Sequence, residues 1–77
     1  MNEIEQKLLQ IFREVFDDDR LETTRETSAA DIEDWDSLAQ INLVVAAEKT
    51  FGVKFSLDEL AELNDVGDML DLITSKL

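Results

Sequence analysis

Asp36-Ser37-Leu38 stands where an acidic, irregular stretch of the chain gives way to a long apolar run. Asp36 is a preferred N-cap residue, because its carboxylate can accept a backbone N–H that a helix start leaves unpaired. Its charge also suits the positive end of the helix dipole. Ser37 then falls in the first turn of a helix, with its hydroxyl at the N-terminus. The chain contains neither cysteine nor histidine, so it has no thiolate chemistry and lacks the usual general base.

A hydrolase would use Ser37 as a nucleophile, which requires a base within hydrogen-bond reach and a pair of donors for the oxyanion. Without histidine the base must be a lysine or a carboxylate, and Lys49 lies about three turns away along the same helix. No Gly-x-Ser-x-Gly sequence surrounds the serine. We therefore expect no enzyme activity and no catalytic residue.

Carboxylates dense enough to suggest a calcium site occur at residues 17–19 and 31–36. An EF-hand loop needs oxygen ligands at its first, third and fifth positions and a glycine at the sixth. Counting from Asp31, the fifth position is the apolar Trp35. We expect no built metal site, and loose binding of divalent cations that relieves charge repulsion stays open.

Size and charge limit the functions open to the chain. A domain of 77 residues buries only a little more than ~60% of its unfolded surface, so a deep catalytic cleft is not expected. The net charge of −12 repels nucleic acid and anionic lipid and favours partners with basic patches. No apolar run approaches the ~20 residues of a membrane span, and the first residues lack the pattern of a signal peptide. We expect a cytoplasmic monomer without nucleic-acid or membrane partners.

The positions of apolar residues predict the helices that hold Ser37. A first amphipathic helix carries an apolar stripe of Ile4, Leu8, Ile11, Phe12 and Val15. Residues 17–36 are too poor in large apolar side chains for a packed helix, although residues 27–32 could form one short turn. A loop this long is usually functional or disordered, and we expect it to be ordered and to lie over the core.

Three further helices are expected after this loop. The second runs from about Ser37 to Phe51 and stops at Gly52, a residue that favours a left-handed cap. Ser56 and Glu59 form a capping-box pattern that opens a short third helix through about residue 63. Asn64 or Asp65 caps a fourth helix, whose apolar stripe is Val66, Met69, Leu70, Ile73 and Leu77. The sequence predicts an all-α fold, a small four-helix bundle forming one domain over residues 1–77, with a long loop between helices one and two.

The second expected helix has apolar side chains on almost every side of its axis. They are Leu38, Ile41, Leu43, Val44, Val45, Ala46 and Ala47. Such a helix must be surrounded or must leave apolar surface exposed. It is either a central helix packed by the other three, or Ile41 and Val45 form a strip near Ser37 that faces a partner or covers a ligand.

Taken together, Asp36-Ser37-Leu38, the acidic loop before it, the apolar second helix and the final run of residues 65–73 make the chain similar to an acyl carrier protein. The resemblance covers essentially all 77 residues. It implies that Ser37 carries 4′-phosphopantetheine, transferred from coenzyme A by a phosphopantetheinyl transferase, and that the arm's thiol holds acyl groups as thioesters. A phosphodiester at a helix N-terminus meets unpaired backbone N–H groups and the positive dipole end.

The resemblance also implies roles for neighbouring residues. Asp36 helps to position Ser37 for the transferase. Acyl-loading and acyl-processing enzymes bind a surface that we expect to contain Trp35, Leu38, Ile41 and Val45.

Two departures from the family pattern qualify this reading. Carriers of fatty-acid synthesis have several acidic residues along the second helix, whereas the matching positions here hold Ala39, Gln40 and Asn42. We infer a carrier of a dedicated fatty-acid, polyketide or specialised-metabolite pathway. Short hydroxyacyl groups are among the candidate cargoes. Trp35 stands where a small residue is common, and could pack in the core or line the partner surface.

Two alternatives remain open. The chain could be an unmodified acidic helical adaptor that binds a protein partner through Ile41 and Val45. It could also be an aminoacyl or peptidyl carrier, although such carriers commonly show a Gly-Gly pair before the serine, and this chain has none.

Overall fold

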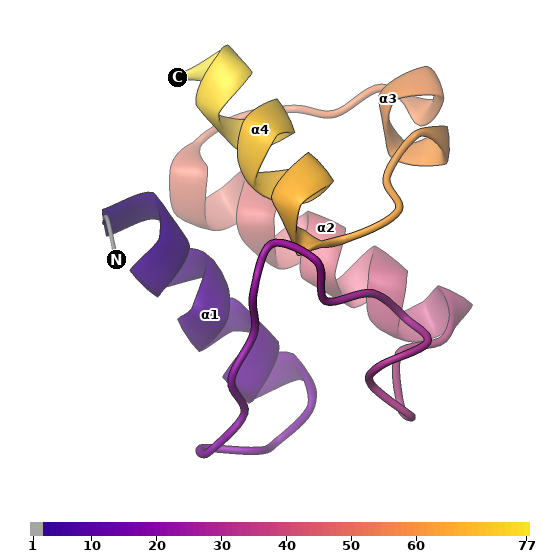
Figure 1. Cartoon of the computed structure of the whole chain (residues 1–77). Coiled ribbons are helices and arrows are strands. Elements are labelled where there is room, and N and C mark those ends of the chain that lie inside the picture. Colours follow the sequence, from indigo (N-terminus) through magenta and orange to yellow (C-terminus); the bar gives the residue numbers. More distant parts are fainter. Residues whose placement is uncertain (1–2) are drawn as a thin grey trace.

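The computed structural model describes residues 3–77, so the first two residues of the expected domain lie outside it. The described chain forms four helices, α1 (Glu3–Val15), α2 (Ser37–Phe51), α3 (Leu57–Ala61) and α4 (Val66–Lys76), and no strand (Figure 1). The predicted all-α fold, the long loop between the first two helices and the short third helix are confirmed. Among these residues, no helix has both the length and the apolar character needed to cross a membrane.

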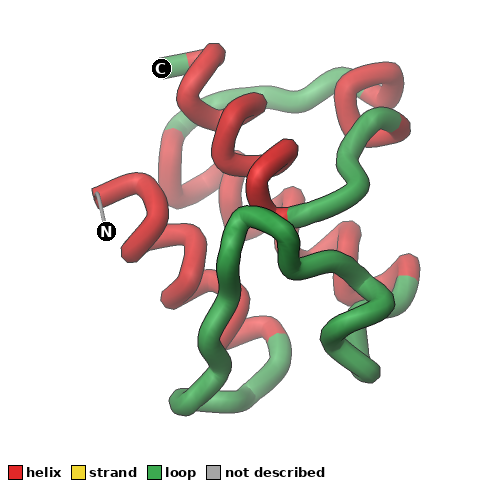
Figure 2. Tube along the Cα trace, in the orientation of Figure 1, coloured by secondary structure: helices red, strands yellow, loops and turns green. Residues whose placement is uncertain are grey.

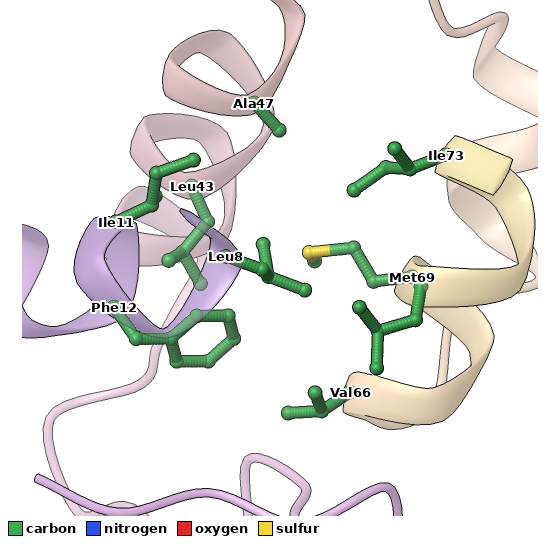
Figure 3. Close-up of a cluster of buried hydrophobic side chains, with 9 residues drawn as sticks. Leu8, Ile11, Phe12, Leu43, Ala47, Val66, Met69 and Ile73 are labelled. Carbon is green, nitrogen blue, oxygen red and sulfur yellow. The ribbon is translucent and has the colours of Figure 1, made fainter. Parts of the chain in front are cut away.

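The core lies between α1, α2 and α4, and α1 packs against both of the other helices. Figure 3 shows side chains from these three helices pointing toward one another. The buried cluster consists of Leu8, Ile11, Phe12, Leu43, Ala47, Val66, Met69, Leu70 and Ile73. Burying one Leu, Ile, Phe or Met side chain contributes about 1.5–3 kcal/mol. Since α3 contains no buried residue, the three longer helices supply the packing that holds Ser37 in place.

The helix ends follow the predicted caps. Gly52 adopts the left-handed conformation (φ 68°) and donates its N–H to the Glu48 carbonyl, which ends α2. Ser56 and Glu59 form the reciprocal capping box at the start of α3. Asp65, rather than Asn64, caps α4 by accepting the N–H of Asp68 at 2.8 Å.

Two details differ from the expected elements. The third helix ends at Ala61 instead of near Leu63, because Glu62 and Leu63 donate to carbonyls only three residues back, which tightens the turn after the helix. Leu77 was expected in the apolar stripe of α4, but it follows the helix at the C-cap and is 65% exposed.

The loop between α1 and α2 is fixed to the start of α4 (Figure 2). Val66 donates its backbone N–H to the Thr27 carbonyl at 2.9 Å, and Gly67 donates to the Arg25 carbonyl at 2.8 Å. The Arg25 guanidinium also pairs with the Asp71 carboxylate at 2.8 Å. These contacts hold the middle of the loop on α4, so that the remaining residues lead back to the N-terminus of α2.

Candidate modification site

Ser37 is the first residue of α2, and its side chain is exposed. The other three serines use their hydroxyls in hydrogen bonds. Ser28 donates to the Asp31 carboxylate, Ser56 accepts the N–H of Glu59, and Ser75 donates to the Leu72 carbonyl. Within residues 3–77 the Ser37 hydroxyl has no such partner. It is therefore the serine oxygen that can be modified without breaking a bond of the fold.

Asp36 fixes the helix turn that carries this hydroxyl. Its carboxylate accepts the N–H of Ala39 at 2.9 Å, and its carbonyl accepts the N–H of Gln40 at 2.9 Å. In the described part of the chain, the N–H groups of Ser37 and Leu38 have no protein acceptor. Unpaired donors and the positive end of the helix dipole favour an anion at this position. The donor set therefore fits a phosphate ester on Ser37.

An open groove of about 490 Å³ lies beside the serine. Its lining residues are Ala29, Trp35, Asp36, Ser37, Gln40 and Ile41. Ala29 comes from the loop and the others from the start of α2 or the residues before it. The fixed loop thus forms one wall of the groove next to Ser37.

Trp35 is half-buried. Its ring packs edge-on against Phe12, with centroids 5.2 Å apart and planes at 84°, and its centroid lies 6.4 Å from that of Phe16. The indole Nε1–H donates to Gln40 Oε1 at 2.7 Å. The tryptophan thus combines packing on the core with a face on the groove, so the two roles considered for it are compatible.

The exposed side of α2 is apolar near Ser37. Leu38 is 66% exposed, Ile41 59% and Val45 42%, whereas Leu43 and Ala47 on the same helix are fully buried. The two explanations of the apolar helix therefore apply to different faces: α2 packs on α1 and also exposes a strip. We call Leu38, Ile41 and Val45 the α2 strip.

Residues 17–19 and 31–36 are the acidic segments at which loose cation binding was left open. Among the described residues, no group of three or more Asp, Glu, His or Cys side chains is arranged to hold a metal ion.

Gln40 is a site residue that the sequence did not predict, although it both lines the groove and bonds Trp35. Its spacing of five residues from Trp35 spans the helix start, where simple helical periodicity gives no signal.

The fold and the site together define a small helical protein that offers one exposed, unbonded serine hydroxyl beside a groove. Comparison with known proteins agrees with this description. The sequence model of a family described as "Phosphopantetheine attachment site" matches residues 6–73.

Individual proteins give the same result. An acyl carrier protein of Acidothermus cellulolyticus is 40% identical over 68 residues, which cover 88% of this chain and 81% of that protein. A meromycolate extension acyl carrier protein of Mycolicibacterium aurum is 38% identical over 66 residues, covering 86% and 68%. The solution structure of holo acyl carrier protein from Geobacter metallireducens is similar with a TM-score of 0.89 at 50% identity, over 99% of this chain and 86% of that one.

The chain belongs to the phosphopantetheine-binding acyl carrier protein family. It is a carrier rather than a catalyst, and its prosthetic group is 4′-phosphopantetheine. Membership of the family implies that the chain interacts with a phosphopantetheinyl transferase and with acyl-processing enzymes. When attached, the group supplies the thiol that holds acyl groups as thioesters, in a chain that has no cysteine of its own.

Proposed function

We propose that Ser37 is the residue that bears 4′-phosphopantetheine. The observation that carries this assignment is that Ser37, at the N-terminus of α2, is the serine whose hydroxyl makes no hydrogen bond within residues 3–77. In the transfer, the Ser37 oxygen releases its proton to solvent and bonds to the β-phosphorus of coenzyme A. The bond from that phosphorus to adenosine 3′,5′-bisphosphate breaks, and the bisphosphate leaves with the electron pair. Asp36 positions the serine through the backbone turn that it caps.

The α2 strip and the exposed edge of Trp35 form the proposed surface for partner enzymes. The strip adjoins Ser37, so an enzyme bound there lies close to the prosthetic group. Between Leu38 and Val45, α2 carries no acidic side chain, since Ala39, Gln40 and Asn42 fill the polar or small positions. Recognition therefore depends mainly on apolar contact and less on charge, in contrast to carriers with an acidic second helix.

This surface supports assignment to a dedicated pathway that makes a specialised lipid, polyketide or related metabolite. The similarity to a carrier whose name specifies meromycolate extension is consistent with such a role, because that name links one related chain to one particular process. We place the loading of the carrier in the cytoplasm, where coenzyme A is available, and expect the carrier to act as a monomer.

Mapping the modified residue tests the assignment. The apo protein is incubated with coenzyme A and a broad-specificity phosphopantetheinyl transferase, then digested and fragmented by mass spectrometry. The expected result is one added phosphopantetheine on the peptide that contains residues 36–38, localised to Ser37. Localisation to Ser28, Ser56 or Ser75 would contradict the proposal.

A further inference from the structure

Two separate spaces meet at the same side chains near Ser37. The open groove contains Ser37. A smaller, partly open pocket of about 70 Å³ adjoins it, and we call this pocket the inner cavity because it reaches the buried Met69. The residues lining both spaces are Ala29, Trp35 and Gln40, and those lining only the inner one are Leu63, Asn64, Asp65 and Met69. Trp35 and Gln40 therefore border both the groove and a pocket that reaches the core at Met69.

The Trp35–Gln40 pair is held from both sides. The bond from the indole Nε1–H to Gln40 Oε1 is 2.7 Å long and partly buried, which shields it from competing water. Trp35 also rests edge-on against Phe12, which is fully buried, and Gln40 is anchored in the first turn of α2 by its N–H bond to Asp36. A chain that passes between the indole and the Gln40 side chain would have to break this hydrogen bond and move the indole away from Phe12.

The inner cavity is small, so opening the pair gives an acyl chain little additional space. Its volume of about 70 Å³ is less than half of the ~150 Å³ that holds one benzene molecule in an engineered apolar cavity. One of its walls is Met69, which is 1% exposed and packed in the core (Figure 3). A longer chain could enter only by displacing core side chains, which are closely packed in proteins.

We propose that Trp35 and Gln40 form a gate that keeps the tethered acyl group in the groove and out of the core. A short acyl group fits in the open groove beside Ile41 without moving the gate. A longer chain stays exposed to solvent instead of being sheltered between the helices. This inference rests on the proposed attachment at Ser37, and it makes Trp35 and Gln40 the residues that determine where the acyl chain lies.

The test compares where acyl chains of different length lie. The protein is loaded from butyryl- or octanoyl-coenzyme A with a broad-specificity transferase, and intact mass confirms each product. Methyl NMR then follows Ile41 in the groove and Met69 in the cavity, relative to the holo protein. In the wild type we expect both acyl groups to shift the Ile41 methyl resonances and to leave the Met69 methyl unchanged.

Two variants open the gate from opposite ends of the hydrogen bond. Gln40→Ala removes the acceptor, and Trp35→Phe removes the donor while keeping an aromatic ring against Phe12. In either variant we expect the octanoyl form to shift the Met69 methyl, whereas Asn42→Ala, an exposed control on the same helix, behaves as the wild type. If one of the two variants does not fold, the other variant alone tests the gate.

The outcomes separate this inference from the function on which it rests. If the octanoyl group shifts Met69 in the wild type as much as in the variants, the gate is wrong and the carrier role stands. If Met69 stays unshifted in a folded variant, the pair does not control entry and the gate is again wrong. Loading that does not occur at Ser37 would overturn the attachment site and the gate together.

Discussion

The Asp36 carboxylate accepts a hydrogen bond from the backbone N–H of Ala39 at 2.9 Å, and Ser37 lies inside the turn that this bond closes. The Asp36 carbonyl bonds Gln40 in the same turn. Asp36 therefore acts on the backbone beneath the serine, and within residues 3–77 it makes no hydrogen bond to the Ser37 hydroxyl. The residue before the proposed attachment serine is thus a structural part of the candidate site.

Replacing the cap tests this role. We expect Asp36→Ala to lower the free energy of unfolding by about 1 kcal/mol, the usual cost of losing an N-cap acceptor. Asp36→Asn keeps an acceptor oxygen and should remain close to the wild type. Urea denaturation followed by circular dichroism measures both variants. Equal losses in the two would show that the charge, not the hydrogen bond, stabilises the turn.

The Glu59 carboxylate should contribute stability that is lost in acid. The Ser56 N–H donates to Glu59 Oε1 at 2.8 Å, and the Lys76 ammonium lies 2.9 Å from the same oxygen. The Ser56 bond first, and then Lys76, lower the pKa of Glu59 below its ordinary value. A carboxyl with a lower pKa in the folded state stabilises the fold above the unfolded pKa, and this stabilisation disappears as pH falls through the folded pKa.

We therefore expect Glu59→Gln to flatten the fall of the melting temperature as the pH drops below about 4.3, the ordinary pKa of glutamate. The control is Glu62→Gln, because Glu62 is an exposed acid nearby that makes no ion pair among the described residues. Parallel pH profiles for Glu59→Gln and the wild type would contradict this assignment.

Gly67 tests how firmly the loop is held on α4. A Cβ at this position would lie 3.0 Å from the Arg25 carbonyl oxygen. That oxygen already accepts the Gly67 N–H at 2.8 Å, so the loop cannot withdraw without weakening the bond. Overpacking costs about 1–3 kcal/mol, whereas helix propensity favours alanine by about 1 kcal/mol.

We expect Gly67→Ala to lower the free energy of unfolding by about 1 kcal/mol, as the difference between these two effects. Equilibrium urea unfolding at constant salt provides the value. A variant more stable than the wild type would mean that the loop moves aside freely.

Charge repulsion should make the stability depend on salt. The chain carries a net charge of −12, and four of its basic residues, Lys7, Arg13, Arg25 and Lys76, are already in ion pairs. Screening should therefore raise the melting temperature between low and moderate ionic strength. A gain of about 1 kcal/mol would appear as a rise of about 4–8 °C in a domain of this size. An unchanged melting temperature would contradict the prediction.

Magnesium chloride at equal ionic strength extends this measurement. Since the described residues form no cluster that could hold a metal, NaCl and MgCl₂ should give similar rises. A much larger effect of magnesium would instead indicate a bound cation.

The local features of the fold could be predicted because their causes lie within a few residues. The Asp36 cap, the left-handed Gly52 and the Ser56–Glu59 capping box each depend on side chains within three residues or on one backbone conformation. The attachment of the loop to α4 could not be predicted. It joins Thr27 to Val66 through backbone atoms, which leave no pattern in side-chain types.

The residues of the candidate site also divide into those that the local sequence predicts and those that depend on the packing of distant segments. Residue type and position predict that Asp36 caps a helix that begins at Ser37, and the structure has this arrangement. The apolar pattern of α2 could not assign Leu43 to the core and Ile41 to the surface, because that depends on which face α1 covers. Gln40 was missed because its role depends on the position of the Trp35 indole in three dimensions.

The most direct test of the central claim is the intact mass of three proteins after incubation with coenzyme A and a broad-specificity phosphopantetheinyl transferase. These are the wild type, Ser37→Ala, and Ser75→Ala as a control on an exposed serine of α4. The account predicts a gain of one phosphopantetheine unit in the wild type and Ser75→Ala, and none in Ser37→Ala. A gain in Ser37→Ala, or none in the wild type while another carrier is modified under the same conditions, would contradict it.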